Sequence, residues 1–83
     1  MSRKLLEARG KTHGSFATNA KISQAIKALI AEHAKDIPDV QREALDMIAL
    51  KLSRIVSGKA NVRDHWIDLA GYATLASQVC DED

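Results

Sequence analysis

The sequence has little of the residue types that mark specialised classes of protein. It contains one cysteine, one proline and three aromatic residues among 83 positions. The single cysteine, Cys80, cannot form an internal disulfide and has no Cys or His at metal-ligand spacing, which excludes a disulfide scaffold and a structural zinc site and favours a reducing compartment. With so few aromatics, a core must be built from many small contacts among Leu, Ile, Val and Ala, which is typical of close-packed helices.

Charge of one sign and long apolar runs are also missing. Twelve basic and eleven acidic residues leave a formal net charge of +1, whereas a nucleic-acid binder usually shows a basic excess or stripe. No apolar run approaches the roughly 20 residues that span a bilayer, and the first residues lack the apolar core of a signal peptide. The composition therefore disfavours a nucleic-acid or membrane partner and predicts a cytoplasmic protein.

The usual catalytic motifs are missing too. The chain has no Ser-His-Asp order, no C-x-x-C, no H-E-x-x-H and no glycine pattern of a phosphate loop. Nucleophilic catalysis is therefore disfavoured, and the remaining candidates for chemistry are charged side chains on helices.

Apolar residues recur at helical spacing over most of the chain, between clear breaks. We expect a short helix over residues 2–9, a second capped by Ser15 and running to about residue 35, a third capped by Asp39 and running to 57, and a fourth capped by Asn61. The breaks are glycines 10, 14 and 58 and the segment around proline 38. The sequence predicts an all-α fold: one domain over 1–83, a small bundle of three main helices plus the short first one.

The expected helices differ in the faces that they bury. In the second, the apolar stripe comprises Phe16, Ile22, Ala25, Ile26, Leu29, Ile30 and His33. The third is apolar on two faces, because Met47 and Leu50 lie opposite its main stripe, so we expect both to be buried against another helix or a second subunit. A chain this short often gains burial by oligomerising, and we expect a homo-oligomer. In the fourth helix Trp66 falls with the core stripe and His65 outside it.

Two carboxylates four residues apart, Asp64 and Asp68, share one stripe of the fourth helix. Like charges at this spacing repel, so they need cations nearby. Lys51, Arg54 and Arg63 can supply these if the third and fourth helices pack antiparallel. This cluster fits an internal ion-pair network as well as a phosphate site, for which arginine and helix N-termini are suited. Tyr72, on the aspartate side, could stack on a base.

A second pair of carboxylates, Glu43 and Asp46, lies one turn apart on the third helix. This spacing suits Mg²⁺, which binds through one or two carboxylates plus substrate phosphates. A solvated helix face explains it equally well. His13, between Thr12 and Gly14, could contact a ligand from an ordered loop, although a lone loop histidine is more often structural or solvated.

Three stretches of the chain resemble a family of short proteins encoded by tailed bacteriophages and prophages. They are residues 9–14, 49–54 and 63–72, the last with the sequence RDHWIDLAGY. The resemblance runs from Arg9 to about residue 76. It implies a phage origin and a location in the cytoplasm of the infected bacterium more than it implies a mechanism.

A looser resemblance is to the MazG-like all-α nucleotide pyrophosphohydrolases. These enzymes hold Mg²⁺ against a nucleoside triphosphate with E-x-x-E on one helix and E-x-x-D on the next. Glu43-x-x-Asp46 matches the second element, whereas the preceding helix offers only Glu32, followed by His33 and Asp36. The resemblance therefore implies the fold and an ability to hold a nucleotide more than it implies hydrolysis.

Our leading expectation is a protein that binds a nucleotide or another small phosphorylated ligand without turning it over and without a cofactor. Sequestering a nucleotide signal of the host's immunity is one concrete form of this. The expected ligand-binding residues are Arg9, His13, Lys51, Arg54, Arg63, Asp64, Asp68 and Tyr72. One alternative is a Mg²⁺-dependent pyrophosphohydrolase that uses Glu43, Asp46, Asp64 and Asp68. The other is an interaction module that docks on a host protein.

Overall fold

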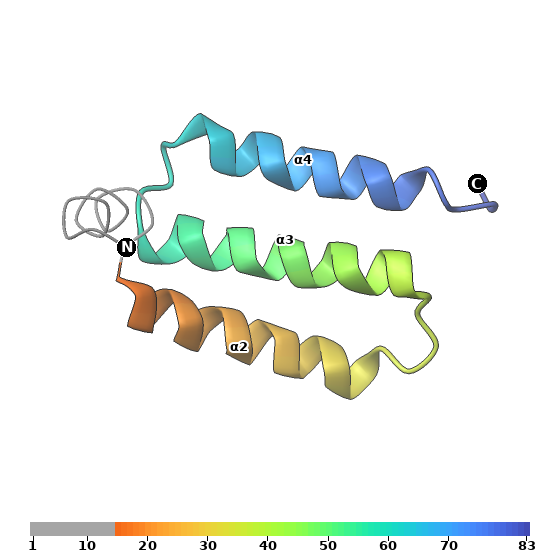
Figure 1. Ribbon diagram of the computed structural model, residues 1–83, viewed down its shortest axis with the longest axis horizontal. Coiled ribbons are helices and arrows are strands. Elements are labelled where there is room, and N and C mark those ends of the chain that lie inside the picture. The colour runs from red at the N-terminus through yellow and green to blue at the C-terminus, as the bar shows by residue number, and fades with distance from the viewer. Residues whose placement is uncertain (1–14) are drawn as a thin grey trace.

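The computed structural model describes residues 15–83, which form three helices and no strand. These are α2 (Phe16–His33), α3 (Asp39–Ser57) and α4 (Arg63–Ser77), and they run back and forth as antiparallel neighbours with α3 in the middle (Figure 1). The all-α fold expected from the sequence is confirmed. The expected helix over residues 2–9 lies outside the described part of the chain. None of the described helices combines the length and the apolar character that a membrane span requires.

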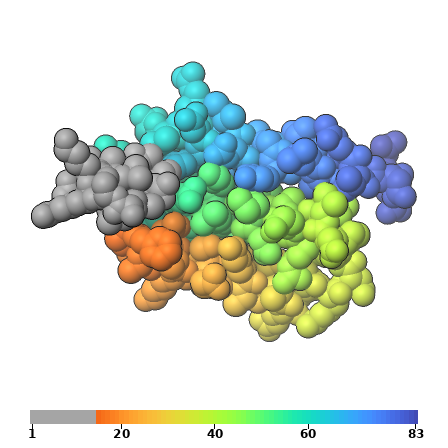
Figure 2. All heavy atoms as spheres, viewed as in Figure 1, coloured from red at the N-terminus to blue at the C-terminus, as the bar shows by residue number. Residues whose placement is uncertain are grey.

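The three-helix bundle is open. α3 packs against α2 on one side and α4 on the other, while no Cα pair within 8 Å joins α2 to α4 over the described residues. The space-filling view shows the same order, with α3 as a green band between the other two (Figure 2). The helices thus form a single layer, and only α3 has neighbours on two sides. Within residues 15–83 the buried apolar side chains are Ala44, Ala49 and Ile55 alone.

The start of α2 agrees with the sequence. Ser15 has an extended backbone, and its hydroxyl accepts a hydrogen bond from the Thr18 backbone N–H at 3.1 Å, as an N-cap does. α2 ends at His33, two residues before the expected end, where the Ala34 N–H donates to the Ile30 carbonyl at 2.8 Å. Among the described helices α2 meets only α3, so they cover a single face of it. Phe16, Leu29 and His33, expected on the buried stripe, are therefore exposed.

The other two expected caps were wrong. α3 begins at Asp39 itself, with Pro38 in the capping position, since the fixed φ of proline suits the entry to a helix. α4 begins at Arg63 after Val62, which makes no side-chain capping bond, and Asn61 lies one residue too early. A turn explains this offset, because the Trp66 indole N–H donates to the Ala60 carbonyl at 2.7 Å and holds the linker against the first turn of α4.

The face of α4 that packs on α3 differs from the expected one. His65 is 2% exposed and Trp66 is 53% exposed, the reverse of the expectation. The least exposed positions of α4 are His65, Asp68, Leu69, Tyr72 and Ala76, which recur every three to four residues. The helix is rotated so that this polar and small-residue stripe meets α3, which the apolar pattern alone does not predict. Met47 and Leu50, expected to be buried, are half-buried within the chain.

The contact between α2 and α3 is polar at its centre. Asn19 and Ser23, one turn apart on α2, are buried, and so is Ser53 on α3. The Ser53 hydroxyl hydrogen-bonds to the Asn19 side-chain oxygen and also lies 2.6 Å from the Leu50 carbonyl. Small side chains let the two helices approach closely, and the hydrogen bond compensates for the polar atoms that this approach buries.

Candidate functional site

An ion pair between α3 and α4 is the centre of the candidate site. The Lys51 ammonium lies 2.8 Å from the Asp68 carboxylate, which confirms the expected pairing between a cation of the third helix and an aspartate of the fourth. The two partners differ in burial, since the Lys51 side chain is 11% exposed and that of Asp68 is 44% exposed. The methylene chain of Lys51 therefore crosses the helix interface, and its ammonium group lies at the edge of the layer.

Two more ionisable groups act on Asp68. The hydrogen bond from Lys51 is the main reason why the pKa of Asp68 is lowered, partial burial opposes this, and the charges of Lys51, His65 and Arg54 lower it further. His65 is buried one turn before Asp68 on α4, and Arg54 lies one turn after Lys51 on α3. The helix packing thus gathers two permanent cations and a histidine around one carboxylate.

Arg54 is the least satisfied member of this cluster. Its side chain is half-buried, and its Nε is buried without a hydrogen-bond partner. None of the ion pairs among the described residues involves it. A buried donor without an acceptor costs free energy, more so when the group is charged. The Arg42 Nε is buried and unbonded as well, but Asp46 lies beside it, whereas no described carboxylate pairs with Arg54, so the Arg54 guanidinium is the one that lacks an anion.

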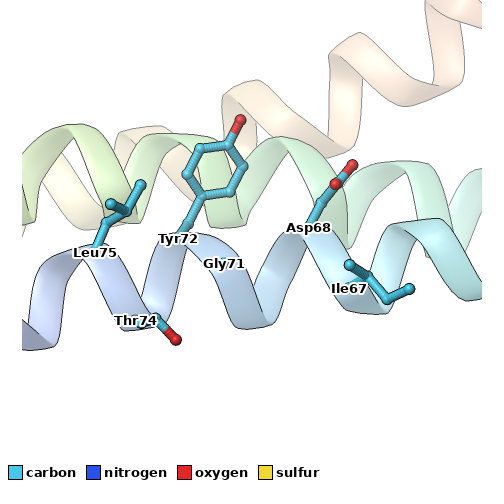
Figure 3. A pocket seen from close by; sticks show the side chains of 6 residues that line it. All are labelled: Ile67, Asp68, Gly71, Tyr72, Thr74 and Leu75. Atoms are coloured by element: carbon cyan, nitrogen blue, oxygen red, sulfur yellow. The ribbon is translucent and has the colours of Figure 1, made fainter.

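Next to the ion pair, the surface of α4 is hollowed. The hollow has a volume of about 480 Å³ and is lined by Ile67, Asp68, Gly71, Tyr72, Thr74 and Leu75. Asp68, Tyr72 and Leu75 project to the same side of α4, whereas Thr74 points away (Figure 3). A Cβ added at Gly71 would meet no atom within 4 Å, so the helix is open there. Half-buried Tyr72 places an aromatic ring one turn from the Asp68 carboxylate.

The structure divides the expected ligand-binding residues into three groups. Lys51, Arg54 and Asp68 come together at the α3–α4 contact, with Tyr72 beside them. Arg63 and Asp64 are exposed in the first turn of α4, away from the helix interface. Arg9 and His13 lie outside the described residues.

The proposed magnesium ligands do not form an acidic cluster in the described structure. Glu43 is exposed, and the Asp46 carboxylate lies 3.9 Å from the Arg42 guanidinium, one turn away on the same helix. Over residues 15–83 no group of three or more His, Cys, Asp or Glu side chains is placed to hold a metal ion. The arrangement around Asp68 is one of cations, which attract an anion.

Sequence reasoning missed the polar interior. The sequence predicted His65 on the outside and no buried role for Asn19, Ser23 or Ser53, whereas all four are buried. A signal was present in their spacing, because Asn19 and Ser23 recur at one helical turn, as do Ala49 and Ser53. The Ser23 hydroxyl is buried and makes no hydrogen bond.

The chain belongs to the family defined by the domain of unknown function DUF6378, whose model matches residues 2–80. No curated protein and no solved structure matches the chain significantly. The family match covers α2, α3 and α4 together.

Proposed function

We propose that the chain binds a small phosphorylated ligand, such as a nucleotide, at the cluster of Lys51, Arg54 and Asp68. The observation that carries this proposal is the Arg54 guanidinium, half-buried with its Nε buried and unbonded. Arginine presents several N–H donors in a planar fork that matches phosphate oxygens. A phosphate at this position would supply the acceptor that Arg54 lacks.

The charge balance of the cluster supports an anion. Asp68 is hydrogen-bonded to Lys51, so its charge compensates that lysine, and among the described residues no carboxylate forms an ion pair with the second cation, Arg54. The hollow adjoining Asp68 adds an apolar wall and the Tyr72 ring. Base stacking on an aromatic ring contributes to affinity with little regard to base identity. Phosphate binding at Arg54 and stacking at Tyr72 together favour a nucleotide.

Binding without turnover is the better-supported form of this function. Hydrolysis of a triphosphate by a MazG-like mechanism needs several carboxylates around Mg²⁺. Glu43 points to solvent and Asp46 is beside Arg42, so neither adjoins the cations described above. These positions support a binder over a hydrolase.

A phage origin would explain the biological role of such a binder. A protein made in the cytoplasm of an infected bacterium that holds a nucleotide without changing it removes that nucleotide from solution. Sequestration of a nucleotide signal of the host's immunity is the role that we propose. An oligomer would present several such sites in one particle.

Calorimetry with ATP, with a cyclic dinucleotide and with inorganic pyrophosphate, each with and without Mg²⁺, tests the proposal. At least one of these should bind the wild type. Arg54→Ala should weaken that affinity roughly 10- to 150-fold, the equivalent of one charged hydrogen bond of about 1.5–3 kcal/mol. Lys21→Ala removes one positive charge from an exposed position of α2 and should leave the affinity unchanged.

Recovery of the ligand after incubation separates the rival functions. The proposal expects the nucleotide to be recovered intact, and Glu43→Gln to bind as the wild type does. Conversion of ATP to AMP and pyrophosphate that is lost in Glu43→Gln would establish a pyrophosphohydrolase instead. Equal binding by Arg54→Ala and the wild type, or no binding of any probe, would refute the proposed site and favour an interaction module.

A further inference from the structure

The helix layer has two open sides, and two contacts between α3 and α4 mark them. Lys51 and Asp68 pair on one side. On the other side, the Gln41 amide lies 3.9 Å from the Cys80 sulfur. Successive residues of a helix are rotated by about 100° around its axis. The two contacts therefore assign each residue of α3 and α4 to one side of the layer or the other.

Among the described residues, the centre of the side marked by Gln41 has no carboxylate, ammonium or guanidinium, whereas Glu32 of α2 and Arg63 of α4 lie toward its outer edges. On α3 the flank that includes Gln41 continues through Leu45, Leu52 and Val56. Because α2 and α4 run antiparallel to α3, each of them contributes one flank to the same side of the layer. The residues that it gathers from the outer helices are Ile22, Ile26 and Leu29 of α2 and Trp66, Leu69 and Ala73 of α4. The charged residues Glu43, Arg54 and Asp68 lie on the opposite side.

Much of this uncharged face is open to solvent in the single chain. Val56 is 70% exposed, Leu29 60%, Trp66 53% and Leu52 38%. Soluble monomers rarely expose a continuous apolar surface that crosses several helices, and such surfaces usually mark an interaction site. Here the exposed residues come from all three helices.

We infer that this uncharged face binds a second copy of the chain, layer against layer, about a twofold axis. A twofold contact places a surface against itself, so a like charge on it would meet its own copy. With no Asp, Glu, Lys or Arg at its centre, this face avoids such repulsion there, and it offers no central charge to select an acidic or basic partner. The inference concerns the side of the layer opposite Arg54 and is independent of the proposed ligand.

The small core favours a second layer against this face. Residues 15–83 bury only three apolar side chains. An ordinary stable interface takes roughly 800 Å² from each partner, and such a contact would enlarge the core.

Light scattering coupled to size-exclusion chromatography tests the inference with a matched pair of variants. The wild type should have twice the 9.1 kDa mass of the chain. Val56→Glu introduces a charge into the uncharged face at an exposed position and should give a monomer with an unchanged helical circular-dichroism spectrum. Leu75→Glu makes the same kind of change at a similarly exposed residue in the hollow beside Asp68, and it should remain a dimer.

The fluorescence of Trp66 reports on dimerisation without any substitution. Its indole lies on the uncharged face and is half-exposed in the single chain, so dimerisation should shift its emission to shorter wavelength. Dilution of the wild type from about 100 μM should reverse this shift as the mass falls. A wild type that is monomeric at all these concentrations, or dissociation by Leu75→Glu with Val56→Glu still dimeric, would overturn the inference.

Discussion

Removal of the Ser53 hydroxyl tests the polar contact between α2 and α3 most directly. Ser53 is fully buried and hydrogen-bonds to the Asn19 side-chain oxygen, and Asn19 is buried as well. Ser53→Ala removes one oxygen atom and leaves almost the same shape. The Asn19 oxygen then stays in the helix contact without this donor.

The expected loss of stability differs between variants at the Ser53 end and at the Asn19 end of this hydrogen bond. A buried acceptor that loses its donor costs about 1–3 kcal/mol, so Ser53→Ala should destabilise the fold by that amount. In Asn19→Ala the Ser53 hydroxyl retains the Leu50 carbonyl, 2.6 Å away, as an alternative acceptor. The double variant should therefore lose less stability than the sum of the two single variants, since neither polar group is left behind.

Urea unfolding followed by circular dichroism at one fixed protein concentration measures these differences. Ser77→Ala is the control, because the exposed Ser77 hydroxyl donates to the Thr74 carbonyl at 2.7 Å and its removal should change stability by less than about 0.5 kcal/mol. If Ser53→Ala were as stable as the control, the buried polar contact would contribute nothing to holding α2 on α3, and the reasoning would be refuted.

Two further predictions concern α4. Because the Lys51 hydrogen bond lowers the pKa of Asp68, the carboxylate should stabilise the fold fully above the ordinary aspartate pKa of about 3.9 and lose this effect as the pH falls through the lower folded-state pKa. Urea midpoints of the wild type should therefore exceed those of Asp68→Asn at neutral pH and converge with them at the acidic end, and a constant gap between pH 2 and 7 would contradict the pairing. Gly71→Ala should stabilise the chain by roughly 0.5–1 kcal/mol, because a Cβ there meets nothing within 4 Å and glycine is costly inside a helix. Thermal unfolding measures this change, and a destabilised variant would show that another surface covers Gly71.

Helices were predictable from the sequence because their breaks are local. Proline 38 and the Ser15 cap act through adjacent backbone atoms, so residues nearby in the chain decide them. The caps of α3 and α4 were each displaced by one residue, since the Pro38 backbone and the Trp66 indole compete with the side chains expected to cap.

The rotation of each helix was not predictable in the same way. The apolar residues of a helix predict its buried face well when several neighbours cover that face. Among the described helices, α2 and α4 each contact α3 alone. His65 is buried and Trp66 exposed because of how α4 lies on α3, which no single helix encodes. The Lys51–Asp68 pair was predictable because antiparallel packing across a short link brings the end of α3 beside the start of α4.

The open order of the helices also bears on how the chain folds. Every interhelical contact between described helices joins neighbours in the sequence, across the links 34–38 and 58–62. Closing such short links costs little entropy, and proteins dominated by local contacts fold fast. Either helical hairpin, α2–α3 or α3–α4, can form first and serve as the template for the remaining helix. Native-state hydrogen exchange should then protect the amides of α3 longest, because both outer helices can detach while α3 keeps one neighbour.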